Sequence, residues 1–153
     1  MKVDYSGYRY IVFAQSGRTM TVTFNRPESL NAMTAEMHEE TSRLFYDLGM
    51  DHSIDVVILT GAGKAFSAGG DIAGMREMYE DTEKFDRSIM EAKKVVFGIL
   101  DCEKVIICKM NGDAVGLGAT IGLFCDIIFA ADHARIGDPH VRNRGTIGGS
   151  IAN

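Results

Sequence analysis

Apolar residues recur along the chain in patterns that separate strands from helices. The β-forming residues of 8–15 and 19–25 lie on either side of Ser16-Gly17, which predicts a hairpin. A short, continuous apolar run is typical of a strand that is buried on both faces of a parallel sheet. Such runs occur at 54–60, 105–110 and 126–130. The sequence therefore predicts a hairpin followed by buried strands.

Helical spacing of apolar residues fills the segments between these runs. In the first such segment Met37, Leu44 and Leu48 fall on one face, and Gly49 ends the pattern. The helices predicted in this way span 34–49, 71–79, 84–100 and 116–124. Strands that alternate with helices predict an α/β architecture, and a length of 153 residues favours a single domain.

Composition and charge narrow the function classes. The chain is 46% hydrophobic and 24% charged, as in globular proteins, and its net charge of −5 gives no basic surface for nucleic acid. We see no apolar run long enough for a membrane span and no secretory signal at the N-terminus. Cys102, Cys108 and Cys125 form no C-x-x-C pair, which predicts reduced, buried thiols, no metal site and a cytoplasmic protein.

Glycine is concentrated in a few loops. Of the 17 glycines, 13 fall within 61–74, 112–122 and 137–149. The first two clusters each follow a predicted strand and precede a predicted helix, where backbone N–H groups can point toward an anion. These loops are therefore candidates for a binding or catalytic site.

Neither loop fits a nucleotide-binding motif. Ile58 and Ala65 stand where a Walker A loop needs glycine and Ser or Thr, and Phe66 and Ile121 stand where a dinucleotide fingerprint needs its third glycine. Two interpretations remain open. The glycines serve tight turns, or the two loops form an oxyanion hole, which is a pair of N–H donors for an oxygen that gains negative charge.

Four segments in order resemble the crotonase superfamily, the family of enoyl-CoA hydratases and isomerases. They are Asn25–Met33 (N-R-P-x-x-x-N-A), Lys64–Ile72 (K-A-F-S-A-G-x-D), Asn111–Gly118 (N-G-x-A-x-G) and Cys125–Ala130 (C-D-I-I-x-A). Together they cover about residues 8–140. The resemblance implies an α/β fold, a crotonase-like spiral of ββα units that is truncated at its C-terminus.

The resemblance also implies the site and its ligand. In the family an acyl-CoA thioester carbonyl lies between two backbone amides, which are those of Gly70 and Leu117 here, and they hold the charge of an enolate. The residues implied to contact the CoA substrate are Ala32, Ser67, Ala68, Gly69, Asp71, Gly116 and Gly118. Coenzyme A enters as part of the substrate, with no separate cofactor. The family further implies fatty acid metabolism and a homo-oligomer, a trimer or hexamer.

The acid and base positions depart from the family pattern. Thr120 and His140 stand where the hydratases of the family carry their two glutamates. Hydration by the two-glutamate mechanism is therefore not expected. Because an imidazole titrates near neutral pH, we assign proton transfer to His140, with Asp138 or Asp113 as candidate helpers. The alternative is that His140 is a polar loop residue without a catalytic role.

Other titratable residues are given no chemistry. His38, His52 and His133 are expected to be exposed or on helix surfaces. Asp71 and Asp126 are expected to cap a helix or brace the structure rather than to catalyse.

The tail fits the family poorly. Residues 141–153 resemble the R-N-x-G-T-I-G-G-S segment with which the flavin subunits of molybdenum hydroxylases bind FAD. We therefore divide the chain into an incomplete crotonase-like core, 1–140, and an atypical tail, 141–153. The expected function is that of an acyl-CoA hydratase, isomerase or related lyase. The alternatives are a non-catalytic truncated or chimeric remnant and a flavoprotein fragment.

Overall fold

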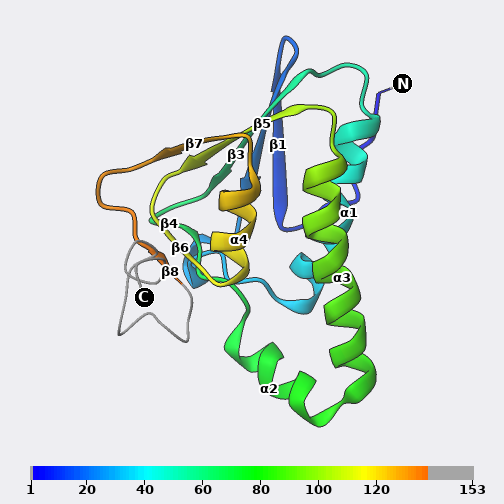
Figure 1. Ribbon diagram of the computed structural model, residues 1–153, viewed down its shortest axis with the longest axis vertical. Helices are drawn as coiled ribbons and strands as arrows, with labels where there is room; N and C mark the ends of the chain where they lie inside the picture. The colour runs from blue at the N-terminus through cyan, green and yellow to red at the C-terminus, as the bar shows by residue number, and fades with distance from the viewer. Residues whose placement is uncertain (1, 138–153) are drawn as a thin grey trace.

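The larger sheet is built from the predicted hairpin and the three apolar runs. A computed structural model describes residues 2–137, and in it the hairpin strands pair antiparallel while each later strand is added in parallel. The strand order is β1-β2-β3-β5-β7, as Figure 1 shows. The strands are β1 (Ile11–Ser16), β2 (Thr19–Phe24), β3 (Val56–Gly61), β5 (Val105–Met110) and β7 (Ile127–Ala130).

A second, smaller sheet was not predicted. Its parallel strands β4 (Ala65–Ser67), β6 (Asp113–Val115) and β8 (Ile136–Gly137) lie in the order β4-β6-β8. Strands of two or three residues are too short to show an apolar period, so the sequence pattern did not reveal them. Each follows a strand of the larger sheet, and the chain therefore winds as a spiral of ββα units, which confirms the expected fold class.

The helices form close to the predicted positions. They are α1 (Ala35–Met50), α2 (Ile72–Glu80), α3 (Thr82–Asp101) and α4 (Leu117–Phe124), and Pro27–Ser29 forms a 3-10 turn, η1. Helix α3 begins before the predicted residue 84 because Asp81 caps it, accepting hydrogen bonds from Glu83 N and Lys84 N. Figure 1 shows α1 and α3 side by side next to the larger sheet, with α2 at the far end of α3.

The core lies between the sheets and the paired helices. Phe24 and Phe66 meet edge to face within it, and Phe45 is buried on α1. Cys108 and Cys125 are buried and Cys102 is half-buried, and all three are free thiols. No helix within residues 2–137 is long and apolar enough to cross a lipid bilayer.

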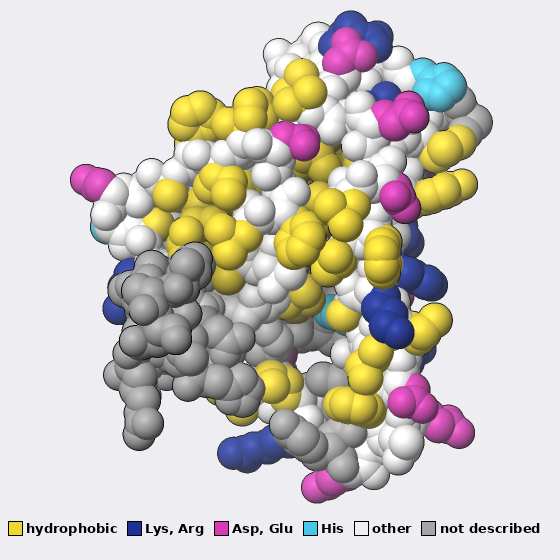
Figure 2. Space-filling model, in the orientation of Figure 1, with side chains coloured by type: hydrophobic (Ala, Val, Ile, Leu, Met, Phe, Trp, Pro, Cys, Tyr) yellow, Lys and Arg dark blue, Asp and Glu magenta, His cyan; other side chains and the backbone are white. Residues whose placement is uncertain are grey.

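Two of the three apolar runs contradict their predicted burial, since β5 exposes Val105 and Lys109 and β7 is exposed along its whole length. The run 126–130 was expected to be covered on both faces, but Ile127, Ile128 and Phe129 are 38–65% exposed. Strand β7 is the edge of its sheet, and no strand within the described part of the chain pairs with its outer side. Figure 2 shows hydrophobic side chains gathered on this face over β7, α4 and α3. The run is apolar as predicted, but no segment among residues 2–137 covers both faces of β7.

Candidate active site

The first wall of the site is the loop that follows β4. The N–H of Met33 donates to Gly69 O at 2.7 Å, and the N–H of Asp71 donates to Met33 O at 3.0 Å, so Met33 and Gly70 form a parallel bridge. In this geometry the N–H of Gly70 itself points away from Met33. No group among residues 2–137 accepts a hydrogen bond from it. The predicted donor Gly70 is therefore exposed and unpaired within the described chain.

The second wall is the first turn of α4. Gly116 is its N-cap, with φ +55°, and no side chain caps the helix. The first helical hydrogen bond runs from Thr120 N to Gly116 O, at 3.0 Å. The N–H of Leu117 precedes it and finds no acceptor within residues 2–137, while the Leu117 side chain packs against the core. This N–H also lies at the positive end of the helix dipole.

The two walls touch through glycines. A Cβ on Gly69 would lie 2.5 Å from Val115 O and 3.5 Å from Gly116 Cα. A Cβ on Gly118 would lie 2.6 Å from Ser67 Cβ and 2.7 Å from Ser67 O. Neither approach leaves room for a side chain. The structure thus brings the loop of Gly70 against the helix start of Leu117.

Three of the residues implied to contact CoA form hydrogen bonds within the protein. Ser67 is fully buried: its hydroxyl donates to Asn31 O at 2.9 Å and accepts from Gly69 N at 3.2 Å. Ala68 donates its N–H to Leu30 O at 2.9 Å. The carbonyl of Ala32 accepts from the Arg26 guanidinium. Because the side chain of Ser67 is fully buried, its hydroxyl is not accessible to a ligand.

Two aspartates have structural roles, as expected. The carboxylate of Asp71 caps α2 by accepting from Gly74 N at 3.1 Å. The carboxylate of Asp126 accepts from Ile106 N at 2.7 Å and so holds the start of β5. Both groups stabilise local backbone.

The candidates for proton transfer are only partly described. Thr120 lies one turn after Leu117, and its hydroxyl donates to Gly116 O at 3.2 Å. Asp113 pairs with Arg135, whose guanidinium and backbone N–H hold the pKa of that carboxyl below its usual range. The carboxylate of Asp113 is therefore engaged in an ion pair with Arg135 and is not free to accept a proton from a substrate. His140 and Asp138 lie outside the described residues.

One histidine differs from expectation. His52 and His133 are exposed, but His38 lies between α1 and α3, where its Nδ1 is 2.7 Å from Glu91 Oε2. The side chains are 12% and 11% exposed. The expectation of a surface position is wrong for His38, because its side of α1 faces α3. No local sequence pattern predicts that α3 packs there.

Sequence reasoning also missed two asparagines. Asn31 and Asn111 appeared only as letters of the family motifs, yet both side chains bind the loop 61–65. For Asn111 the available signal was a polar residue directly after the apolar strand β5, whereas Asn31 follows the turn η1 and carried no such signal.

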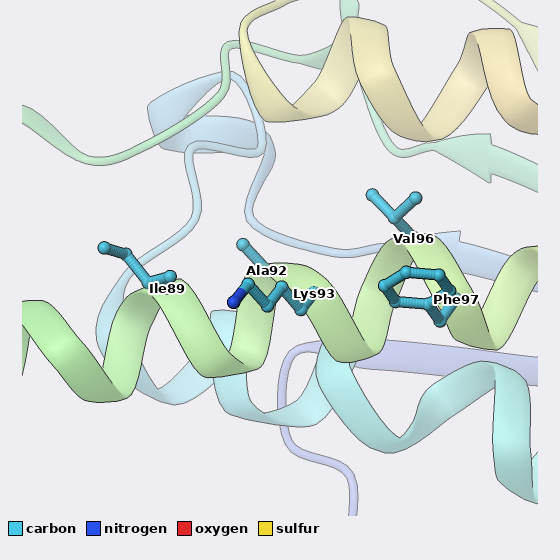
Figure 3. A pocket seen from close by; sticks show the side chains of 5 residues that line it. All are labelled: Ile89, Ala92, Lys93, Val96 and Phe97. Carbon is cyan, nitrogen blue, oxygen red and sulfur yellow. The ribbon is translucent and has the colours of Figure 1, made fainter.

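A surface groove elsewhere has no such chemistry. Figure 3 shows it on α3, where it is lined by Ile89, Ala92, Lys93, Val96 and Phe97. Lys93 is the only titratable side chain of this lining. No group of three or more His, Cys, Asp or Glu residues within 2–137 could hold a metal ion. The glycine walls remain the candidate site.

Comparisons with known proteins identify the family of the chain. A family model described as enoyl-CoA hydratase/isomerase matches residues 15–152. A short-chain-enoyl-CoA hydratase from Clostridium acetobutylicum is 36% identical over 141 residues, which are 86% of this chain and 50% of that protein. A probable peroxisomal enoyl-CoA hydratase from Arabidopsis thaliana is 32% identical over 130 residues, or 84% of this chain and 46% of that protein.

Solved structures show the same fold. The crystal structure of an enoyl-CoA hydratase/isomerase from Mycobacterium paratuberculosis superimposes with a TM-score of 0.86 at 34% identity, covering 90% of this chain and 55% of that one. The chain thus spans about half the length of the curated relatives that it matches. The family match includes most of the flavin-like segment 141–153, which lies outside the described residues. The chain belongs to the enoyl-CoA hydratase/isomerase family.

Proposed function

We propose that this chain binds an acyl-CoA thioester and stabilises the thioester enolate between the N–H groups of Gly70 and Leu117. One observation carries the proposal: two backbone donors without acceptors in the described chain lie on segments that glycines bring into contact. Abstraction of the proton next to the thioester carbonyl places negative charge on its oxygen. Each donor aimed at that oxygen contributes about 100- to 1000-fold in rate.

The proton must be moved by a group other than paired glutamates. Thr120 occupies the first glutamate position, and its hydroxyl is already bonded to a backbone carbonyl. We assign proton transfer to His140, since an imidazole is suited to general acid or base work near neutral pH. The reaction class is then that of a hydratase, isomerase or related lyase acting through an enolate. Coenzyme A is part of the substrate, and no separate cofactor is proposed.

The setting proposed for this activity is fatty acid metabolism in the cytoplasm, in a homo-oligomer such as a trimer or hexamer. The exposed apolar side chains of β7 and α4 support assembly, because a contiguous apolar surface marks an interaction site. The competing function is a non-catalytic CoA-binding protein. The absence of a carboxylate at residue 120 favours it.

A backbone donor can be tested because Leu117 is the first residue of α4. Proline is tolerated at this position and has no N–H, so Leu117→Pro removes the donor while the helix remains. Leu117→Ala keeps the N–H and measures the loss of the side chain alone. Turnover of short-chain enoyl-CoA substrates and calorimetric binding of acyl-CoA are compared between the two variants. We expect Leu117→Pro to lose about 100-fold or more in turnover relative to Leu117→Ala.

The outcomes separate the candidate functions. Acyl-CoA binding without turnover by the wild-type chain supports the non-catalytic protein, and flavin absorbance in the purified protein supports a flavoprotein. Equal turnover by the two Leu117 variants rejects this amide as a donor. Undiminished turnover by His140→Ala rejects His140 as the proton-transfer residue.

A further inference from the structure

We propose that Asn31 and Asn111 act together as positioning residues, which we call the asparagine clamp, that hold the Gly70 wall in its active geometry. This proposal rests on the proposed function, because its catalytic consequence is the placement of the Gly70 donor. Neither side chain is needed to touch the substrate. Both act through the loop 61–65 and the strand β4 that follows it.

Asn111 holds the loop from the end of β5. Its Oδ1 accepts from Gly61 N at 3.0 Å. Its Nδ2 donates to Gly63 O at 3.1 Å and to Ala65 O at 3.2 Å. One side-chain amide therefore bonds both the first and the last residue of the loop and fixes its width.

Asn31 holds the same loop from the other side. It is fully buried and has the left-handed φ of +55°. Its Oδ1 accepts from Arg26 N at 2.8 Å, and its Nδ2 donates to the carbonyls of Ala62 and Ala65, both at 2.9 Å. A left-handed backbone costs a non-glycine residue about 1–2 kcal/mol, and the three side-chain hydrogen bonds of Asn31 offset this cost.

The two amides converge on one atom, the carbonyl oxygen of Ala65. Ala65 is the first residue of β4, which is only three residues long, so the position of this carbonyl sets where β4 begins. At the other end of β4, the Ser67 hydroxyl donates to Asn31 O and accepts from Gly69 N. A continuous series of hydrogen bonds thus runs from Asn111 to the residue that precedes the Gly70 donor.

The loop packs closely against the start of β4. A Cβ on Gly61 would lie 2.4 Å from Ala65 O, and one on Gly112 would lie 2.0 Å from Lys64 O. Because the backbones touch here, we expect a displaced loop to carry the start of β4 with it. A misplacement of about 1 Å at a catalytic group costs on the order of 100-fold in rate, so the effect appears in kcat.

Asn111→Asp is the informative variant. It keeps the size of the side chain and an oxygen for Gly61 N, but it replaces the Nδ2 donor with an oxygen that faces two carbonyls. Gln15→Glu is the matched control: its Nε2 also donates to two carbonyls, Gly17 O at 3.1 Å and Ser53 O at 3.2 Å. Gln15 lies at the opposite end of the sheet, since it pairs with Met20 at the start of β2.

The measurements are kcat and KM with an enoyl-CoA substrate, the urea midpoint, and the ¹H–¹⁵N NMR signal of the Gly70 amide. We expect Asn111→Asp to lower kcat by about 100-fold with little change in KM, and to shift the Gly70 signal. Gln15→Glu should leave kcat and the Gly70 signal unchanged, with a smaller loss of midpoint because Gln15 is exposed. Asn111→Ser, which removes the donors without adding charge, gives the same comparison if the aspartate variant does not fold.

Two results overturn the clamp. One is a kcat in the Asn111 variants no lower than in Gln15→Glu, and the other is an unmoved Gly70 amide signal. Failure of the proposed function looks different, because the wild-type chain itself then neither binds nor converts the thioester. In that case the clamp is still judged by the Gly70 signal, which needs no substrate.

Discussion

The close approach of the two walls can be measured as a free energy of unfolding. Gly69 combines two constraints, a φ of +82° and a position where a Cβ would lie 2.5 Å from Val115 O. Gly17 shows the first constraint alone, with φ +57° and no atom within 4 Å of its would-be Cβ. Gly118 shows the second alone, with a would-be Cβ at 2.6 Å from Ser67 Cβ. The three alanine variants therefore separate backbone strain from overlap.

The expected costs follow from these geometries. Gly17→Ala should destabilise by about 1–2 kcal/mol, the cost of a left-handed conformation for a residue with a Cβ. Gly118→Ala should destabilise by about 1–3 kcal/mol, the cost of inserting a methyl group into a packed interior. Gly69→Ala should lose the sum, about 2–5 kcal/mol. The entropy that alanine removes from the unfolded chain is common to all three variants and cancels in the comparison.

The assay is equilibrium unfolding in urea followed by far-ultraviolet circular dichroism, because the chain contains no tryptophan to report by fluorescence. Acyl-CoA binding by the folded variants is measured in parallel, and Gly69→Ala should lose it while Gly17→Ala retains it. A Gly69→Ala variant no less stable than Gly17→Ala would refute the reasoning. The loop of Gly70 and the start of α4 would then have space between them, and the geometry of the two donors would not be fixed by contact.

Two further perturbations test contacts away from the walls. Glu91→Gln should destabilise the chain by about 1–3 kcal/mol, measured in urea, since it removes the charged partner of the half-buried His38, whereas Asp86→Asn on the exposed face of α3 should have no such effect. Arg135→Met should raise the pKa of Asp113, followed by carboxyl NMR; an unchanged titration would contradict the pairing. Because the folded pKa of Asp113 is lowered, its stabilisation is present above about pH 4 and is lost as the pH falls through the lowered value.

The period of apolar residues predicted the long elements well. The hairpin, α1 and β5 lie within a few residues of their predicted positions, because each has enough residues to show a face. Strands β4 and β6 were missed since three residues have no measurable period. The burial of β7 was wrong for another reason: an apolar run shows that a strand can be covered, not that a neighbour is present.

The candidate site depended on a different kind of information. Gly70 and Leu117 were identified from the family resemblance, and no periodicity marks a free backbone N–H. Asn31 and Asn111 were missed because their partners are distant along the chain: Ala65 is 34 residues from one and 46 from the other. The His38–Glu91 pair joins residues 53 apart. Such contacts exist only once the sheet order is known.

Among residues 2–137, strand β7 leaves the larger sheet open at one edge. Each ββα unit adds one strand to each sheet, and among the described residues the last unit leaves β7 and β8 as the outermost strands. The outer edge of β7 carries no charge, proline or bulge, which are the devices that keep sheet edges from joining. Within residues 2–137 the spiral therefore has no built-in stop, and whatever covers the edge of β7 governs whether copies of the chain associate.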